Sequence, residues 1–317
     1  MKCRICGNNK ANNAFEAREM MYGYRDVHHY FQCAKCDCLQ ITQIPLNLER
    51  YYDASYYSFQ SITSTGIRHS VSRLRNRYAL FRKGTIGKLL YLKYPTQQFA
   101  FLEPILSTLS VDSRFLDVGC GAGRLLQSLR SLGFVNLLGV DLFIQRDIHY
   151  GNALIIKKQS IHAVQGIFDV VMFHHSFEQL KDPLDSLHTA FSLLPSGGYC
   201  IIRIPVVNSY AWKRYGVNWV QLDAPRHLFL HSTASMEIIA NKAGFDISDI
   251  VYDSTALQFY GSEQYLRDIP LMDPRSYSVN PRKSIFSEQH IASFEKRAIE
   301  LNATKQGDQA AFYLRKE

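Results

Sequence analysis

The feature that most constrains the fold of this chain is an apolar run that ends in a cluster of glycines. Residues 115–118 have the composition of a short buried strand, interrupted by Asp117, and three glycines follow between positions 119 and 123. Leucines at helical spacing begin directly afterwards, at Leu125 and Leu126. A glycine lacks a Cβ, so it adopts positive φ angles and lets the backbone approach a ligand closely. The pattern therefore predicts a strand, a loop that holds a small molecule, and a helix.

Further apolar runs indicate that this strand belongs to a larger sheet. Residues 137–140 form a second run that ends in Asp141, and two more runs lie at 168–173 and 198–204. Segments with helical periodicity separate most of them, and a crossover between parallel strands is nearly always right-handed. We therefore expect an α/β fold with a doubly wound, mostly parallel sheet, completed by an antiparallel strand near 309–314.

The glycine cluster resembles motif I of the class I S-adenosylmethionine-dependent methyltransferases, a hydrophobic run followed by D-x-G-x-G-x-G. The dinucleotide pattern G-x-G-x-x-G does not fit, because Arg124 stands where its third glycine would be. The resemblance implies a seven-stranded Rossmann-like methyltransferase sheet, S-adenosylmethionine as cofactor, and a role for Asp141 in binding the ribose hydroxyls. The other residues that it assigns to the cofactor are Asp117, Gly119, Cys120, Gly121, Gly123, Leu142, Ser160 and His174.

Three more segments narrow the resemblance to a subgroup found in bacterial sugar and surface-polysaccharide pathways. They are residues 173–180, 194–199 and 223–230, and the first of them carries H-x-x-E-H in that subgroup. Gln179 stands in the last position of this motif, so the sequence does not support an acid–base role there. The subgroup implies a methyltransferase that acts on a sugar, a nucleotide-sugar or a surface glycan.

Candidate acid–base groups follow the fourth and fifth strands of the expected sheet. His175 and Glu178 come directly after one strand and His227 after the next, so they should meet at the carboxyl edge, where such sheets bind ligands. We expect His227 or His175 to be the general base, because the pKa of histidine lies near working pH. Glu178, Asp223 or Arg226 would orient the acceptor. Alternatively, these side chains only cap a strand or a helix, or hold a loop in place.

Four cysteines near the N-terminus have the spacing of zinc ligands. Cys3 and Cys6 form one C-x-x-C pair and Cys33 and Cys36 another, with 26 residues between the pairs. Two such pairs can hold one tetrahedral Zn²⁺ through four thiolates, which leaves no position for water, so the metal would be structural. Cys38 could replace one of these ligands, but the spacing Cys36-x-Cys38 is the poorer one. The competing interpretation is a set of free thiols in a partly disordered N-terminus.

Composition suggests four parts. We expect a zinc ribbon (1–45), a tyrosine-rich lid with a basic helical linker (46–110), a methyltransferase core (111–256 and 309–317), and an insertion (257–308) that is an acceptor cap or an oligomer contact.

The tyrosine-rich and basic segments each allow two interpretations. The tyrosines of residues 51–57 form either a lid over the cofactor or acceptor, or a packed linker. Between positions 68 and 93 the chain carries Arg and Lys but no acidic residue, and the first acid afterwards is Glu103. This basic block either meets a phosphate-rich partner or is a solvated helix face.

Length and composition fit an enzyme of this kind. The 317 residues, 46% of them hydrophobic, are enough for one large core and a smaller satellite domain. The longest apolar runs are too short to cross a membrane, and no secretion signal follows the first methionine, so we expect a cytoplasmic protein without disulfides.

Three functions are compatible with these motifs. The first is methyl transfer to a hydroxyl of a sugar or glycan, with transfer to a carbon of a keto-sugar as its neighbour. The absence of Asn-Pro-Pro-Tyr after the fourth strand argues against an adenine or glutamine nitrogen as acceptor. The second is an RNA-modifying enzyme or RNA-binding module, in which the ribbon and the arginines hold phosphates. The third is a non-catalytic scaffold that keeps the cofactor site. The oligomeric state is left open.

Overall fold

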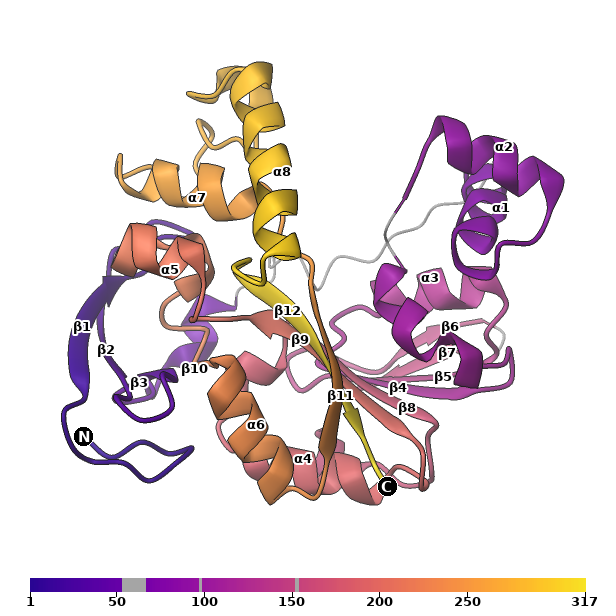
Figure 1. The fold of residues 1–317 in the computed structure, drawn as a ribbon, viewed down its shortest axis with the longest axis horizontal. Coiled ribbons are helices and arrows are strands. Elements are labelled where there is room, and N and C mark those ends of the chain that lie inside the picture. Colours follow the sequence, from indigo (N-terminus) through magenta and orange to yellow (C-terminus); the bar gives the residue numbers. More distant parts are fainter. Residues whose placement is uncertain (53–66, 97–98, 152–153) are drawn as a thin grey trace.

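The centre of the computed structural model, which describes residues 1–52, 67–96, 99–151 and 154–317, is an eight-stranded sheet (Figure 1). Its strand order is β11-β12-β9-β8-β4-β5-β7-β6. The strands are β4 (Arg114–Val118), β5 (Asn136–Val140), β6 (Ile148–Tyr150), β7 (Leu154–Lys157), β8 (Val170–His174), β9 (Tyr199–Pro205), β11 (Asp246–Tyr252) and β12 (Gln309–Arg315).

The expected Rossmann-like sheet is confirmed, but the expected number of seven strands is wrong. Neighbours among β4, β5, β7, β8 and β9 pair in parallel, and β12 runs antiparallel between β9 and β11. The eighth strand, β6, pairs antiparallel with β7 at the sheet edge. Residues 141–153 between β5 and β7 lack helical periodicity, and so short a connection leaves little room for a crossover helix with its loops.

Helices cover both faces of the sheet (Figure 1). Leu126, Leu129 and Leu132 bury one face of α3, which ends at Gly133 with φ 115°. A capping box at Ser232 begins α6. The helices are α1 (Ile67–Phe81), α2 (Thr85–Lys93), α3 (Arg124–Leu132), α4 (Pro183–Ser192), α5 (Tyr210–Tyr215), α6 (Thr233–Lys242), α7 (Leu257–Tyr265) and α8 (Glu288–Ala303). Short 3₁₀ helices are η1 (Leu48–Tyr51), η3 (Ala100–Thr108), η4 (Ile161–Ala163), η5 (Phe177–Gln179), η6 (Gly216–Asn218), η7 (Val220–Leu222) and η8 (Pro281–Lys283).

A second, four-stranded sheet joins the N-terminal segment to the rest of the chain. Its order is β1 (Asn13–Arg18), β2 (Val27–Gln32), β3 (Leu39–Ile41) and β10 (Phe229–Leu230), so its last strand comes from the segment that follows β9. The Ser232 hydroxyl donates to the Cys36 carbonyl at 2.6 Å, and the Lys242 ammonium donates to the Ile5 carbonyl at 2.6 Å. The N-terminal segment is therefore fastened to the residues around β10 and α6.

The segment between β11 and β12 also contacts the N-terminal sheet. Asp268 pairs with Arg18 at 3.3 Å and with Arg25 at 3.0 Å, and the Leu271 amide donates to the Met20 carbonyl. The longest helix of this segment is α8, which begins behind a capping box at Ser287. Within the described ranges, no helix is long and apolar enough to cross a membrane. Positions 53–57 of the expected tyrosine-rich lid lie outside the described residues.

Candidate active site and metal centre

The loop between β4 and α3 needs its glycines for two separate reasons. Gly119 and Gly123 have φ angles of 73° and 75°, which other residues adopt only with strain. A Cβ on Gly119 would lie 2.4 Å from the Cβ of Ser176, and one on Gly123 would lie 2.5 Å from the Cδ1 of Ile156. The loop is therefore packed against the end of β8 on one side and β7 on the other.

Asp141, directly after β5, ties this loop to the neighbouring strand. Its carboxylate accepts hydrogen bonds from the backbone amides of Gly121 at 2.8 Å and Phe143 at 2.7 Å. Burial raises the pKa of Asp141, and these amide donors oppose the rise. A carboxylate has about four lone-pair positions, and the Ile144 amide also lowers the pKa of this group, so at least one position remains open to a ligand.

Asp117 presents a buried oxygen that lacks a partner. The side chain is 2% exposed, and its Oδ1 has no hydrogen bond to any described residue. Burial, with a contribution from the Asp141 charge, raises the pKa of Asp117 to about 8. A buried carboxyl group without a partner is costly, and a cationic or hydrogen-bonding ligand would remove that cost. The loop and its two acids thus fit the aminoacyl and ribose parts of S-adenosylmethionine.

The remaining predicted cofactor residues lie around the same strand ends. His174 ends β8 and packs edge-to-face on Phe101 at 4.5 Å, and burial together with Arg203 lowers its pKa to about 3. The Cys120 side chain points toward Gly139 of β5, where an added Cβ would come within 2.5 Å of its sulfur. Leu142 is exposed after β5, and Ser160 precedes η4 after β7.

Two predicted catalytic histidines lie next to a third predicted catalytic residue, the buried acid Glu178. Glu178 is fully buried, and its Oε1 lies 3.5 Å from the Nε2 of His227 and 3.8 Å from the Nδ1 of His175. Neither carboxyl oxygen of Glu178 has a hydrogen bond among the residues described. Burial raises the pKa of Glu178 to about 8, and the nearby Asp223 charge adds to this.

The hydrogen bonds of the two histidines distinguish their roles. The Nδ1 of His227 lies 2.8 Å from the Gln221 carbonyl, which only accepts, so this nitrogen carries the proton and Nε2 keeps its lone pair. The Nε2 of His175 lies 2.8 Å from the Arg203 guanidinium, which only donates, so that lone pair is occupied. Burial lowers the pKa of both rings, and Asp223 opposes this at His227. His227 is therefore neutral with a free lone pair.

Arg226 connects this cluster to the N-terminal sheet. Its guanidinium is fully buried and donates to both oxygens of Asp223, to Glu19 at 2.9 Å and to the Tyr51 carbonyl at 3.3 Å. Although burial alone would raise the pKa of Asp223, Arg226 lowers it, so Asp223 stays ionised 3.8 Å from His227. Arg226 therefore binds other residues of the protein. The sequence alone did not indicate Glu19 as one of its partners, because Glu19 lies 207 positions away.

Tyr52 links the cofactor edge with the acid–base cluster. Its ring stacks on Phe143 with centroids 4.8 Å apart, and its hydroxyl donates to Gln179 at 3.1 Å. The Gln179 amide in turn donates to the His175 carbonyl at 3.0 Å. Gln179 thus braces the loop through two neutral hydrogen bonds, which explains a glutamine in this position.

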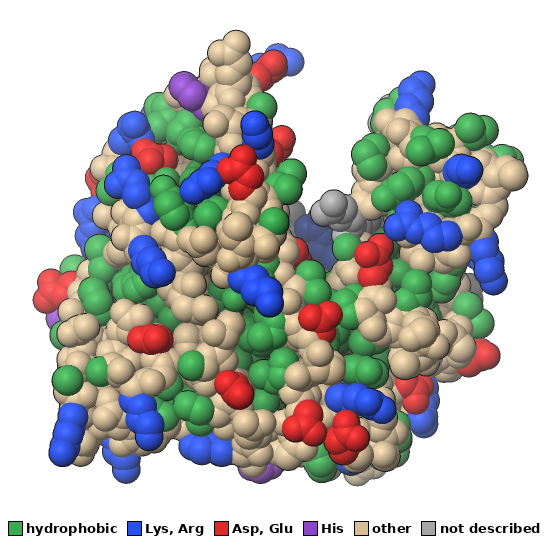
Figure 2. All heavy atoms as spheres, in the orientation of Figure 1, with side chains coloured by type: hydrophobic (Ala, Val, Ile, Leu, Met, Phe, Trp, Pro, Cys, Tyr) green, Lys and Arg blue, Asp and Glu red, His purple; other side chains and the backbone are tan. Residues whose placement is uncertain are grey.

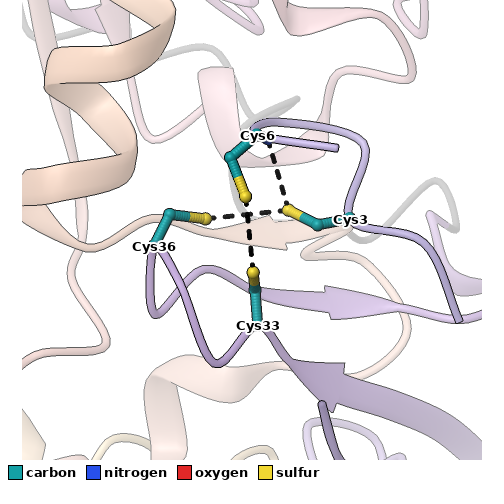
Figure 3. A group of neighbouring side chains, drawn as sticks. All are labelled: Cys3, Cys6, Cys33 and Cys36. Atoms are coloured by element: carbon teal, nitrogen blue, oxygen red, sulfur yellow. Dashed lines mark hydrogen bonds between the residues drawn. The ribbon is translucent and has the colours of Figure 1, made fainter. Parts of the chain in front are cut away.

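The four cysteines with zinc-ligand spacing converge on one point (Figure 3). Their sulfurs all lie within 4.8 Å of one another, with Cys3 and Cys36 at 3.6 Å and Cys6 and Cys33 at 3.5 Å. A Zn²⁺ with four bonds of about 2.3 Å separates its sulfurs by roughly 3.8 Å. The Gln40 amide donates to the Cys3 sulfur at 3.2 Å, as thiolate ligands require. The donor set and its spacing fit a structural zinc ion.

Fold, glycine loop and buried acids together define a class I S-adenosylmethionine-dependent methyltransferase. The methyltransferase domain family matches residues 91–250, half of the 317-residue chain. The chain therefore belongs to this methyltransferase domain family.

Known relatives cover only part of the chain. A ubiquinone biosynthesis O-methyltransferase from Psychrobacter arcticus is 28% identical over 159 residues, which are 44% of this chain and 61% of that protein. One from Nitrosospira multiformis is 27% identical over 153 residues, 43% of this chain and 64% of that protein. The chain thus spans less than two thirds of the length of these relatives. A solved S-adenosylmethionine-dependent methyltransferase from Archaeoglobus fulgidus is 19% identical, with a TM-score of 0.43, over 72% of this chain and 98% of that one.

Proposed function

We propose that this enzyme transfers a methyl group from S-adenosylmethionine to a hydroxyl oxygen and that His227 is its general base. The observation that carries the proposal is the free Nε2 lone pair of His227, which faces the buried Glu178 carboxyl at 3.5 Å. Glu178 lies two residues beyond Ser176, which packs on Gly119 of the glycine loop. A base and a cofactor loop in contact through one turn can align an acceptor between them.

Each polar group of the cluster has a distinct part in this scheme. His227 takes the proton of the acceptor hydroxyl, and the charge of Asp223 stabilises the imidazolium that results. Glu178, largely protonated near neutral pH, donates a hydrogen bond that orients the acceptor. Arg226 and His175 position Asp223 and the Glu178 loop. When bound, S-adenosylmethionine supplies a methyl group activated by its sulfonium charge.

The cofactor would lie along the carboxyl ends of β4, β5, β7 and β8. Asp141 would bind the ribose, and Asp117 the aminoacyl end. Other residues that would line this path are Gly119, Cys120, Gly121, Gly123, Leu142, Ser160 and His174.

The acceptor that the subgroup motifs favour is a hydroxyl of a sugar, a nucleotide-sugar or a surface glycan. The curated relatives favour oxygen as the methylated atom, and they make an intermediate of ubiquinone biosynthesis the second candidate. Both acceptors need a base at the same position, so the residue roles above are unchanged.

We also propose that Cys3, Cys6, Cys33 and Cys36 hold a structural zinc ion. It would stabilise a ribbon of residues 1–45. The other parts would serve as lid and linker (46–110), as catalytic core (111–256 and 309–317) and as acceptor cap (257–308). Asp268 and Leu271 of the last part contact the ribbon within the same chain.

The test is incubation with isotope-labelled methyl donor and a panel of nucleotide-sugars, followed by mass spectrometry of the product. We expect a methyl ether on one sugar class, with transfer that saturates in acceptor. Transfer only to ubiquinone precursors would select the second candidate, whereas a carbon–methyl bond would overturn the assignment of oxygen. No transfer to either panel, together with undetectable cofactor binding in calorimetry, would refute the proposed function.

A further inference from the structure

The helical hairpin of α1 and α2 has a face that the catalytic site does not use. Figure 1 shows the two helices standing out from the sheet beside α3, well away from α7 and α8. Asn76, Ala79 and Leu80 are buried on the inner side of α1, whereas Val71 and Leu74 are 41% and 44% exposed.

The packed side of α2 is fixed by its contacts with α1. A Cβ on Gly87 would lie 2.6 Å from the Leu74 carbonyl oxygen, so the two backbones touch there. The ring of Tyr91 lies 5.8 Å from that of Tyr78. At roughly 100° per residue, Gly87 and Tyr91 lie about 40° apart on the helix, so they mark a single face.

The opposite face of α2 is aliphatic and turned to solvent. Ile86, Leu89 and Leu92 are 62%, 68% and 68% exposed, and Leu89 lies about 180° from the midpoint of the packed side. Three large aliphatic side chains at such spacing on one small helix exceed the scattered exposure of an ordinary surface. In a helix that packs only on its partner, this face would be polar.

Basic residues precede α2, lie beside its aliphatic face and end the helix. Lys83, Lys88 and Lys93 are exposed, and no acidic residue occurs between positions 54 and 102. Figure 2 shows hydrophobic and basic side chains next to one another over this part of the surface. An aliphatic stripe flanked by lysines is the pattern of a helix that lies in the plane of an anionic membrane.

We propose that the α1–α2 hairpin docks on an anionic lipid bilayer. Ile86, Leu89 and Leu92 enter the boundary between headgroups and acyl chains, and the lysines meet the lipid phosphates. An RNA strand would pair with the lysines but leave the aliphatic face in water, since single strands bind through charge and aromatic stacking. A second copy of the chain would bring the two sets of lysines against each other.

The test is flotation of the full-length protein with vesicles. We expect binding to phosphatidylcholine vesicles that contain phosphatidylglycerol. Partition onto pure phosphatidylcholine should be at least about tenfold weaker, because each lysine near an anionic surface adds to the binding free energy. Leu89→Ser combined with Leu92→Ser should lower partition at least about tenfold, and Lys88→Glu combined with Lys93→Glu should lower it in the same direction. Both pairs lie on the surface, so unchanged thermal unfolding and cofactor affinity verify the fold of each variant.

Matched controls come from α8, which carries an equally exposed aliphatic side chain. Ile299 is 69% exposed, and Ile299→Ser with Lys296→Glu should leave vesicle binding unchanged. Equal losses in the α8 and α2 variants, or no binding to anionic vesicles, would overturn the proposal. Binding to RNA without binding to vesicles would also overturn it. So would a dimer, seen in sedimentation, that Leu89→Ser dissociates, if the protein does not bind vesicles. Vesicle binding is measured without cofactor or acceptor, so its failure leaves the proposed methyl transfer untouched.

Discussion

The glycine loop and the acid–base cluster lie side by side but are built in opposite ways. The loop, its strand and Asp141 come from one continuous stretch of residues 114–143, in which backbone amides donate to the Asp141 carboxylate. The cluster draws Glu19 from the N-terminal sheet, Glu178 from the end of β8, and His227 from the segment before β10. A local site is robust to changes elsewhere in the chain, whereas the cluster depends on how distant segments are fastened together.

Replacing His227 should separate the two regions most strongly. His227→Asn removes the nitrogen that takes the proton, so kcat should fall by about 10²–10⁴-fold, the usual contribution of a general base. Cofactor affinity, measured by calorimetry, should stay within about twofold because the glycine loop keeps its own hydrogen bonds. His188→Asn, an exposed change on α4, is the matched control. An unaltered kcat in His227→Asn would show that His227 is not the base.

Breaking the ribbon should damage the cluster and spare the loop. Cys33→Ser, or removal of zinc by a chelator, should lower the free energy of unfolding by several kcal/mol. It should also reduce kcat, because β3 pairs with β10 directly after the His227 segment. Glu19→Gln tests the same link at a single residue. Leaving Arg226 without this charged partner should lower the free energy of unfolding by about 3–5 kcal/mol.

Metal analysis, thermal unfolding and calorimetry check the prediction for the ribbon together. Cys200→Ser, a buried cysteine of β9 outside the cluster, tests whether any loss comes only from a missing thiol. Full activity in the protein stripped of zinc would show that the cluster does not need the ribbon.

How much of each region could be predicted from the sequence follows from the same contrast. The loop was predictable because positive φ angles and the strand–loop–helix order are encoded by neighbours such as Gly119 and Asp141. The convergence of the two cysteine pairs was predictable from their spacing, although the contact of the ribbon with β10 was not. Glu19 carried no signal, because its partner Arg226 is distant in sequence. The edge strand β6 was not predicted, because the weak helical periodicity of the segment after Asp141 indicates only that a helix is absent and not that a strand is present.

Asp141 tests the loop in isolation. Asp141→Asn should weaken cofactor binding by about 10–100-fold, since hydrogen bonds to a charged group contribute about 1.5–3 kcal/mol. The dependence of the remaining activity on pH should keep its shape, because the cluster around His227 is unchanged. Isothermal calorimetry and a pH–rate profile measure the two effects, and Asp112→Asn, at an exposed acid before β4, is the control. A shifted pH profile in Asp141→Asn would mean that the two regions are coupled.

The last prediction concerns stability rather than activity, and it comes from Glu178. Its pKa rises from 4.5 to about 8 on folding, so the folded state holds this proton more tightly than the unfolded state does. The contribution is complete below pH 4.5 and is lost as pH rises through about 8, so the native protein should become less stable over that window. Glu178→Gln cannot ionise, and its stability relative to the native protein should therefore increase from pH 5 to pH 8 by up to about 3–4 kcal/mol, since each unit of pKa shift corresponds to about 1.4 kcal/mol. Melting curves of both proteins across this range give the difference directly, and constant effects of packing cancel in its slope. A difference that stays flat with pH would show that Glu178 is ionised in the folded protein, and would make it the partner that charges His227 rather than the donor that orients the acceptor.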